Sequence, residues 1–208
     1  MNTKCQNNID LINKLKEQGL ILPSSEDINI YNKSLTLYGK KISNRIGIQP
    51  LEGFDSDLDG SPTDMVRRRY LRFVNGGAGL VWFEACAVSN NGKSNPHQMS
   101  ITANNWSKFK ELIQLMDDTS IASNQAPTFK VLQLTHSGRV SKDSNWNPMP
   151  IAIRKSKEEL NSENVPYIIS DEQIKQVVND HIEAAKLAAN AGFDAGDIKV
   201  CHGYLLSE

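Results

Sequence analysis

The C-terminal segment "DIKVCHGYLL" contains the side chains with the clearest chemical potential in this chain. Lys199, His202 and Tyr204 lie close together there, beside Gly203. A lysine and a histidine that point at one oxygen can stabilise negative charge that develops on it, and a nearby tyrosine can donate a proton. The structural alternatives are a solvated lysine at a strand end and a tyrosine that packs on the rim of the fold. Because Lys199 and His202 are three positions apart, a regular strand would not present both on one face, and Gly203 is expected to break the alternation.

Polar side chains also end three other apolar segments. Gln49 lies near the end of the first, Glu84 lies at the end of the second, and Gln133 and His136 end the third. A glutamine within a buried strand needs hydrogen-bond partners, which either the protein or the edge of a ligand could supply. Glu84 is expected to be a structural acceptor, and Arg139, in the next loop, is expected to pair with Glu84 or another carboxylate.

These polar groups lie in a pattern of strands that alternate with helices. Apolar runs without polar alternation are typical of strands covered on both faces, and strand–helix alternation predicts a parallel sheet. The expected strands are 45–51, 78–88, 127–136 and 193–202, and the expected helices are 63–75, 106–116 and 170–192.

The helix at 170–192 has the strongest sequence signals. Ser170 and Gln173 fit a capping box, and Gly192 is a stop signal. His181 is expected at its packing interface. The stripe predicted to face the core consists of Ile174, Val177, Val178, Ile182, Ala185 and Leu187.

Two parallel architectures fit the alternation: an open doubly wound sheet and a (β/α)8 barrel. The first would carry a glycine-rich phosphate turn after its first strand, but Gly53 and Gly60 have neither dinucleotide-binding nor Walker spacing. In barrels, the carboxyl ends of the strands carry the site. The predicted fold class is therefore α/β, a (β/α)8 TIM-barrel type, with about the first four β/α units in this chain.

Composition narrows the classes of function. The 208 residues carry 23 Lys and Arg against 24 Asp and Glu, so no global charge favours nucleic acid or an anionic membrane. Three cysteines far apart argue against a disulfide framework and against structural zinc, and Cys86 and Cys201 are expected to be small apolar fillers. No signal peptide or long apolar segment stands out. We expect a soluble cytoplasmic protein without a metal site.

The chain is expected to have two parts. Residues 1–43 read as an N-terminal extension, with a short helix at 9–19 and a possible hairpin around Gly39. Residues 44–208 read as the N-terminal half of the barrel. Within this half, the stretch from His136 to Pro166 is expected to be a long functional loop or a small hairpin.

Four segments in order, "NRIGIQPLEG", "GGAGLVWFEACAVSNNGKSNP", "LQLTHSGR" and "AGFDAGDIKVCHGYLLSE", resemble the old yellow enzyme family, also called NADH:flavin oxidoreductases. They span most of the chain from Asn44 to Glu208. The resemblance implies an FMN-containing (β/α)8 barrel that takes hydride from NAD(P)H and passes it to an activated alkene, typically an α,β-unsaturated carbonyl compound.

The resemblance also implies roles for individual residues. The first two catalytic roles fall on Lys199 and His202, which would hold the substrate carbonyl oxygen, and the third falls on Tyr204, the proton donor. The implied FMN-binding residues are Pro50, Leu51, Ala85 and Gln133, of which Gln133 would hydrogen-bond the flavin pyrimidine.

Lys199 departs from the family motif H-x-x-H/N-G-Y, whose first position is usually histidine. A lysine still donates a hydrogen bond and adds a positive charge, which could stabilise an enolate oxygen or the reduced flavin. The added charge would suit carboxylated or otherwise anionic alkenes. Another alternative is an aldolase that uses Lys199 to form a Schiff base.

A closed barrel needs eight strands and holds its cofactor phosphate with loops after strands seven and eight. This chain supplies about four strands, so we expect incomplete catalysis and weak FMN binding by the chain alone. A homo-oligomer or a second chain would complete the barrel. The alternative function is a non-catalytic half-barrel that self-associates or docks with a second chain as an assembly or binding module.

Overall fold

The computed structural model describes residues 5–25, 27–123, 125–161 and 165–208. Its centre is a parallel sheet of four strands in the order β3-β4-β5-β8. The prediction of a parallel α/β sheet is confirmed, because each strand lies within the apolar run that predicted it. The strands are β3 (Gly47–Ile48), β4 (Leu80–Ala87), β5 (Phe129–Thr135) and β8 (Ala195–Ile198).

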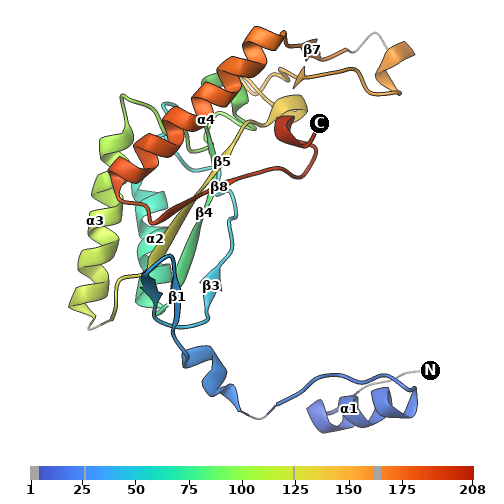
Figure 1. The fold of residues 1–208 in the computed structure, drawn as a ribbon, viewed down its shortest axis with the longest axis vertical. Coiled ribbons are helices and arrows are strands. Elements are labelled where there is room, and N and C mark those ends of the chain that lie inside the picture. The colour runs from blue at the N-terminus through green and yellow to red at the C-terminus, as the bar shows by residue number, and fades with distance from the viewer. Residues whose placement is uncertain (1–4, 26, 124, 162–164) are drawn as a thin grey trace.

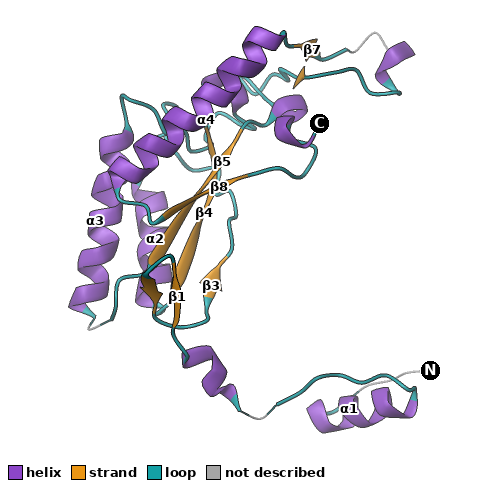
Figure 2. Ribbon diagram, in the orientation of Figure 1, coloured by secondary structure: helices purple, strands orange, loops and turns teal. Residues whose placement is uncertain are grey.

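Three long helices lie on one side of the sheet (Figures 1 and 2). They are α2 (Asp64–Asn75), α3 (Trp106–Ala122) and α4 (Asp171–Ala191). Thr63 caps α2 by accepting a hydrogen bond from the Val66 N–H at 3.3 Å. The predicted capping box of α4 is present, and the helix ends at Gly192, whose φ of 99° is left-handed. The only long helix with a misplaced end is α3, which runs to Ala122 instead of Met116 within the described chain.

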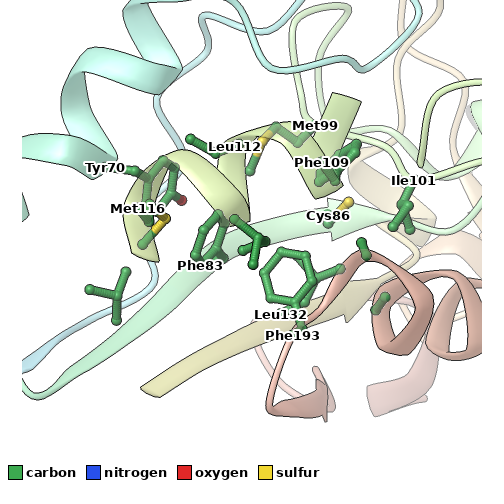
Figure 3. Packing of buried hydrophobic residues seen from close by; sticks show 14 of the residues in the cluster. Tyr70, Phe83, Cys86, Met99, Ile101, Phe109, Leu112, Met116, Leu132 and Phe193 are labelled. Atoms are coloured by element: carbon green, nitrogen blue, oxygen red, sulfur yellow. The ribbon is translucent and has the colours of Figure 1, made fainter. Parts of the chain in front are cut away.

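The main core lies between these helices and the sheet (Figure 3). The Phe83 ring of β4 stacks on Tyr70 of α2, with centroids 3.9 Å apart, and meets Phe193 edge-on at 4.8 Å. Phe109 and Leu112 of α3 are fully buried in the same core. Burial of each such side chain stabilises the fold by roughly 1.5–3 kcal/mol. The helices therefore hold the sheet in place from the face that they cover.

The core-facing side of α4 differs from the predicted stripe. Its buried residues are His181, Ala184, Ala188 and Ala191, whereas Val178 and Ile182 are 54% and 46% exposed. The stripe prediction was therefore wrong for these two residues and for Ala185, which is also exposed. Small alanines let α4 approach its neighbours closely, so the larger aliphatic side chains lie on an adjacent face.

That adjacent face forms an apolar groove of about 320 Å³ between α4, the end of β8 and the C-terminal turn. It is lined by Ile153, Ile169, Ile174, Val177, Val178, His181, Ile182, Ala185, Ile198, Leu205 and Leu206. In the described part of the chain, β8 pairs with β5 alone, so its other edge is open beside this groove.

The predicted hairpin around Gly39 is present as β1 (Leu35–Leu37) and β2 (Lys40–Ile42). Ile42 packs against Phe129 and Val131 on the sheet face away from the helices. The predicted N-terminal helix is α1 (Asn8–Glu17), which has no buried residue and lies away from the sheet (Figure 1). The division of the chain at residue 43 stays a prediction, and residues 1–4 and 26 of the extension lie outside the described residues.

In its described part, the stretch from His136 to Pro166 forms a small antiparallel turn, with a bridge between Lys142 and Pro148, and no hairpin of longer strands. It contains β6 (Ile151–Ala152), which pairs in parallel with β7 (Tyr167–Ile168) just beyond it. Residues 162–164 lie outside the described residues. The short 3₁₀ helices of the chain are η1 (Ile28–Asn32), η2 (Asn90–Gly92), η3 (Gly138–Val140), η4 (Glu159–Asn161) and η5 (Leu205–Ser207).

Candidate active site

A pocket of about 680 Å³ lies at the carboxyl ends of the four sheet strands. Its volume falls within the roughly 300–1,000 Å³ range of small-molecule sites. All seven residues predicted from the sequence line it: Pro50, Leu51, Ala85, Gln133, Lys199, His202 and Tyr204. Their chemical roles stay predictions, but the structure brings residues from four separate segments to one place.

Glu84 positions the loop that follows β3. Its carboxylate is 1% exposed, accepts the Gly53 N–H at 2.9 Å and pairs with Arg69 of α2. Arg69 also pairs with Asp55 of the same loop. Burial raises the pKa of Glu84, an effect that the Gly53 N–H and Arg69 oppose. Glu84 is thus a structural acceptor, as expected from the sequence.

The predicted pairing of Arg139 with Glu84 is wrong, although its alternative, another carboxylate, holds. Arg139 lines the pocket, and its guanidinium pairs with Glu159 and, at 2.8 Å, with Glu208. The reason is topological. Helix α2 packs on β4, so its Arg69 lies next to Glu84, whereas Arg139 lies in η3, near the C-terminal turn.

An irregularity in β4 presents Ala85 to the pocket. The pairing of β4 with β5 shifts register between Phe83 and Cys86. Both of these side chains are buried in the core on the helix side, and Ala85 lines the pocket. The Gln98 side chain donates a hydrogen bond to the Ala85 carbonyl at 2.9 Å, which satisfies the irregular backbone.

Gln133 of β5 is held by its neighbour in β8. Its Nε2 donates to the Asp197 carboxylate at 2.7 Å, and the two residues are partners in the strand register. Since a carboxylate only accepts, the amide nitrogen faces Asp197 and the amide oxygen turns away from it.

The segment after β8 turns sharply where Gly203 was expected to break the strand. The Lys199 N–H makes the last sheet hydrogen bond, to Leu134 at 3.0 Å, and His202 and Gly203 then have left-handed φ values of 62° and 67°. This turn brings the Tyr204 ring under Lys199, whose Nζ lies 4.2 Å from the ring centroid. Lys199 is 8% exposed, whereas His202 is an exposed residue.

Glu52 is a residue of this site that the sequence analysis missed. One of its oxygens lies 3.9 Å from Lys199 Nζ and 3.5 Å from the Tyr204 hydroxyl, and the other accepts from Ser94 Oγ at 2.8 Å. Burial raises the pKa of Tyr204, and the charge of Glu52 raises it further. The sequence contains one signal for Glu52, because this carboxylate directly follows Pro50 and Leu51, which were predicted to bind FMN.

Cys201 also differs from expectation, because it is exposed and not a buried filler. The left-handed turn at the next residue directs the chain away from the core. Cys86 is buried as predicted, and burial raises the pKa of its thiol well above the usual range.

The remaining lining of the pocket suits a flat ring system with a polar edge. Leu51 and Phe54 are large apolar residues that are 82% and 53% exposed. Ser141, also in the lining, is buried, and its hydroxyl has no hydrogen-bond partner among the described residues. Open apolar side chains and an unsatisfied hydroxyl are groups that a bound aromatic ligand can cover and satisfy. The residues present therefore fit the FMN ring implied by the sequence resemblance.

In the described residues, no three His, Cys, Asp or Glu side chains come together as a metal site. No helix in the same residues is long and apolar enough to cross a membrane.

Comparison with known proteins gives a consistent result. A sequence profile of the NADH:flavin oxidoreductase / NADH oxidase family matches residues 33–208. An NADPH dehydrogenase of Bacillus pumilus is 31% identical over 174 residues, which are 83% of this chain and 48% of the relative. An NADH:flavin oxidoreductase of Gibberella zeae is 29% identical over 189 residues, 84% of this chain and 44% of the relative. The chain thus spans about half the length of the curated relatives that it matches.

Solved structures show the same architecture. The old yellow enzyme homologue from Zymomonas mobilis superposes with a TM-score of 0.70 at 23% identity, and the match covers 84% of this chain and 49% of that one. This likeness shows the fold and confirms the prediction of a partial barrel.

Proposed function

The chain belongs to the NADH:flavin oxidoreductase / NADH oxidase family, and from this premise we propose that it is the substrate-binding half of an FMN-dependent reductase. The proposed reaction transfers hydride from NAD(P)H, through the flavin, to an activated alkene such as an α,β-unsaturated carbonyl compound. The observation that carries the proposal is the convergence of seven residues from four strand ends on one pocket.

When bound, FMN supplies the hydride that it has received from NAD(P)H. Pro50, Leu51 and Ala85 would form apolar walls for the ring, and the amide of Gln133 would meet its polar edge. Asp197 fixes the direction of that amide, so the oxygen of Gln133 is the group available to the ligand.

Lys199 and His202 hold the carbonyl oxygen of the substrate. Hydride addition at the β-carbon builds negative charge on this oxygen, and N–H donors directed at it lower the barrier. Tyr204 donates its hydroxyl proton to the α-carbon. A tyrosine hydroxyl is protonated at neutral pH, as an acid requires, and burial raises the pKa of Tyr204 further.

In this proposal, a second copy of the chain, a second polypeptide or the absent half of a longer protein would complete the barrel. The open edge of β8 and the apolar groove beside it support this part. The same groove favours the second candidate function, a non-catalytic half-barrel that self-associates or docks with another chain. Three unpaired cysteines favour a reducing compartment, so we place the protein in the cytoplasm.

Size-exclusion chromatography with mass detection and a visible spectrum, with and without added FMN, tests the proposal. We expect weak FMN binding by the monomer, and stoichiometric flavin with NAD(P)H-dependent reduction of 2-cyclohexenone once the barrel is completed. A completed barrel that stays colourless at saturating FMN would favour the assembly module. Borohydride trapping of a carbonyl substrate on Lys199 would favour the Schiff-base alternative.

A further inference from the structure

The corner of the pocket around Tyr204 contains a pair of opposite charges. Lys199 Nζ lies 4.2 Å from the centre of the Tyr204 ring and 3.9 Å from Glu52 Oε1. The same oxygen of Glu52 lies 3.5 Å from the Tyr204 hydroxyl. The side chains of Lys199 and Glu52 are only 8% and 13% exposed, so water screens the pair weakly.

Glu52 is held in place by groups other than Lys199. Its second oxygen accepts from Ser94 Oγ at 2.8 Å, and the Ser94 backbone N–H donates in turn to Gln98 at 2.6 Å. The next residue, Gly53, is tied to the buried Glu84. The carboxylate is therefore directed at Lys199 by a fixed loop.

The other cations that line the pocket are engaged elsewhere. Arg139 pairs with Glu159 and Glu208. Lys142 Nζ lies 5.2 Å from the centre of the Trp146 ring. His202 completes the set of titratable groups in the lining and is exposed. Among the described cations of the lining, Lys199 is thus the one that lies against both the Tyr204 ring and Glu52, and Glu52 opposes its charge.

We propose that Glu52 is a specificity-determining residue, which neutralises and orients Lys199 so that the pocket accepts an uncharged carbonyl oxygen and rejects a carboxylate at the same point. Glu52 Oε1 lies 3.9 Å from Lys199 Nζ. A ligand carboxylate that reached Lys199 would therefore lie beside the carboxylate of Glu52, and two neighbouring negative charges repel strongly. An uncharged carbonyl or amide oxygen can accept a hydrogen bond from Lys199 without this repulsion.

This inference rests on the proposed function for its substrate class, and it reverses the expectation that Lys199 alone suits anionic alkenes. Lys199 adds a positive charge to the motif, and the negative charge of Glu52 offsets it within the site. The lysine at position 199 therefore does not predict by itself whether the preferred ligand is charged.

Binding of a matched pair of ligands, cinnamamide and cinnamate, tests the proposal because the two differ in charge and hardly in shape. Dissociation constants are measured by NMR titration of the 208-residue chain, with and without saturating FMN. We expect the wild type to prefer cinnamamide, and Glu52→Gln to raise the affinity for cinnamate about tenfold relative to cinnamamide. Glu52→Asp keeps the charge and should keep the wild-type preference.

Asp57→Asn is the matched control. Asp57 is an exposed residue of the same loop and does not line the pocket. Its replacement removes the same unit of charge, and we expect the ligand preference to change by less than about twofold, because exposed charges are screened.

A second measurement does not depend on flavin or turnover. The pKa of Tyr204, followed by NMR of a ¹³C-labelled tyrosine ring and assigned with Tyr204→Phe, should fall in Glu52→Gln, because a nearby carboxylate disfavours the phenolate. Asp57→Asn should leave it in place. If the chain never reduces an alkene, the proposed function fails while both readouts still report on Glu52.

Three results would overturn the inference. One is an unchanged cinnamate preference in Glu52→Gln, and another is an unchanged Tyr204 pKa in that variant. The third is failure of both ligands to bind any variant, since such a pocket would have no selectivity for Glu52 to set.

Discussion

Tyr204 is placed as a proton donor would be. It is half-buried, its hydroxyl lies near Glu52, and burial together with that charge raises its pKa. A packing role on the rim of the barrel would not require the cation that lies over its ring. The phenol is thus kept protonated next to the group that would hold the substrate oxygen.

We predict that Tyr204→Phe separates the two halves of the reaction in the flavin-loaded protein. Loss of the proton donor should slow alkene reduction by about 10²–10⁴-fold. Reduction of the flavin by NAD(P)H needs no proton from this residue and should keep its rate. Stopped-flow absorbance of the flavin measures both steps, and equal losses in both would contradict the assigned role.

His136 gives a prediction for stability. It is 1% exposed, and burial lowers its pKa to about 4, with His181 nearby adding to the effect and Asp180 opposing it. The folded protein therefore keeps His136 neutral, whereas the unfolded chain binds a proton as the pH falls through 6.5. The stabilisation is fully present above pH 6.5 and is lost between pH 6.5 and about 4, by about 3 kcal/mol.

The variant His136→Asn tests this linkage. Its side-chain oxygen can still accept the Gly138 N–H, which His136 Nδ1 accepts at 3.2 Å. Urea denaturation at several pH values should give a flatter dependence between pH 6.5 and 4 in the variant. Identical slopes for the two proteins would show that His136 does not carry the effect.

At the scale of residues, the sequence predicts which side chains gather and does not predict how they pair. The seven pocket residues follow from four strand ends and a family motif. Glu52 lies within one of those motifs, but its partners Lys199 and Ser94 are distant in sequence. Pairings of this kind depend on loop geometry, which local sequence patterns do not encode.

At the scale of elements, the Arg69–Glu84 pair joins α2 to β4 and thereby fixes the loop after β3. Gly53 is close to this pair, because an added Cβ would lie 2.1 Å from an Arg69 nitrogen. Local signals predicted the helix caps and strands well, since caps and apolar runs are properties of short segments. They did not predict the β4 irregularity or the core face of α4, which depend on how closely neighbouring elements approach.

We predict that Arg69→Met destabilises the fold by about 3–5 kcal/mol, because it leaves the buried Glu84 carboxylate without its cation. Urea denaturation followed by circular dichroism gives the free energy of unfolding. The double variant Arg69→Met/Glu84→Gln should recover part of the loss, because it removes the buried charge. If the free energy of unfolding of the single variant fell by less than about 1 kcal/mol, the pair would be no stronger than a surface ion pair.

At the scale of the whole molecule, the sheet has an open edge and an apolar groove on the same side. The four strands form half of the barrel seen in the solved structure, and the helices cover one face (Figure 1). The groove side chains come from α4, β8 and the C-terminal turn. An apolar surface of this kind is usually covered by another polypeptide segment.

We predict that the 23.2 kDa chain self-associates at micromolar concentration, and that Ile182→Glu abolishes this association. Ile182 lines the groove and is 46% exposed, so the change should affect the interface more than the stability of the monomer. Sedimentation velocity measures the mass. Lys186→Gln, on the exposed side of the same helix, changes the net charge by the same single unit and is the control for charge. An unchanged mass distribution in Ile182→Glu would exclude the groove as the interface.

An amide NMR map of the chain titrated with FMN shows directly where the flavin binds. If the pocket at the strand ends holds the flavin ring, shift changes will concentrate at Leu51, Ala85, Gln133 and Lys199, and Ala85→Trp, which fills the pocket, will abolish them. Val165→Trp, in a separate pocket lined by His136 and Tyr167, should leave them intact. Shift changes confined to that other pocket, or unaffected by Ala85→Trp, would contradict the account.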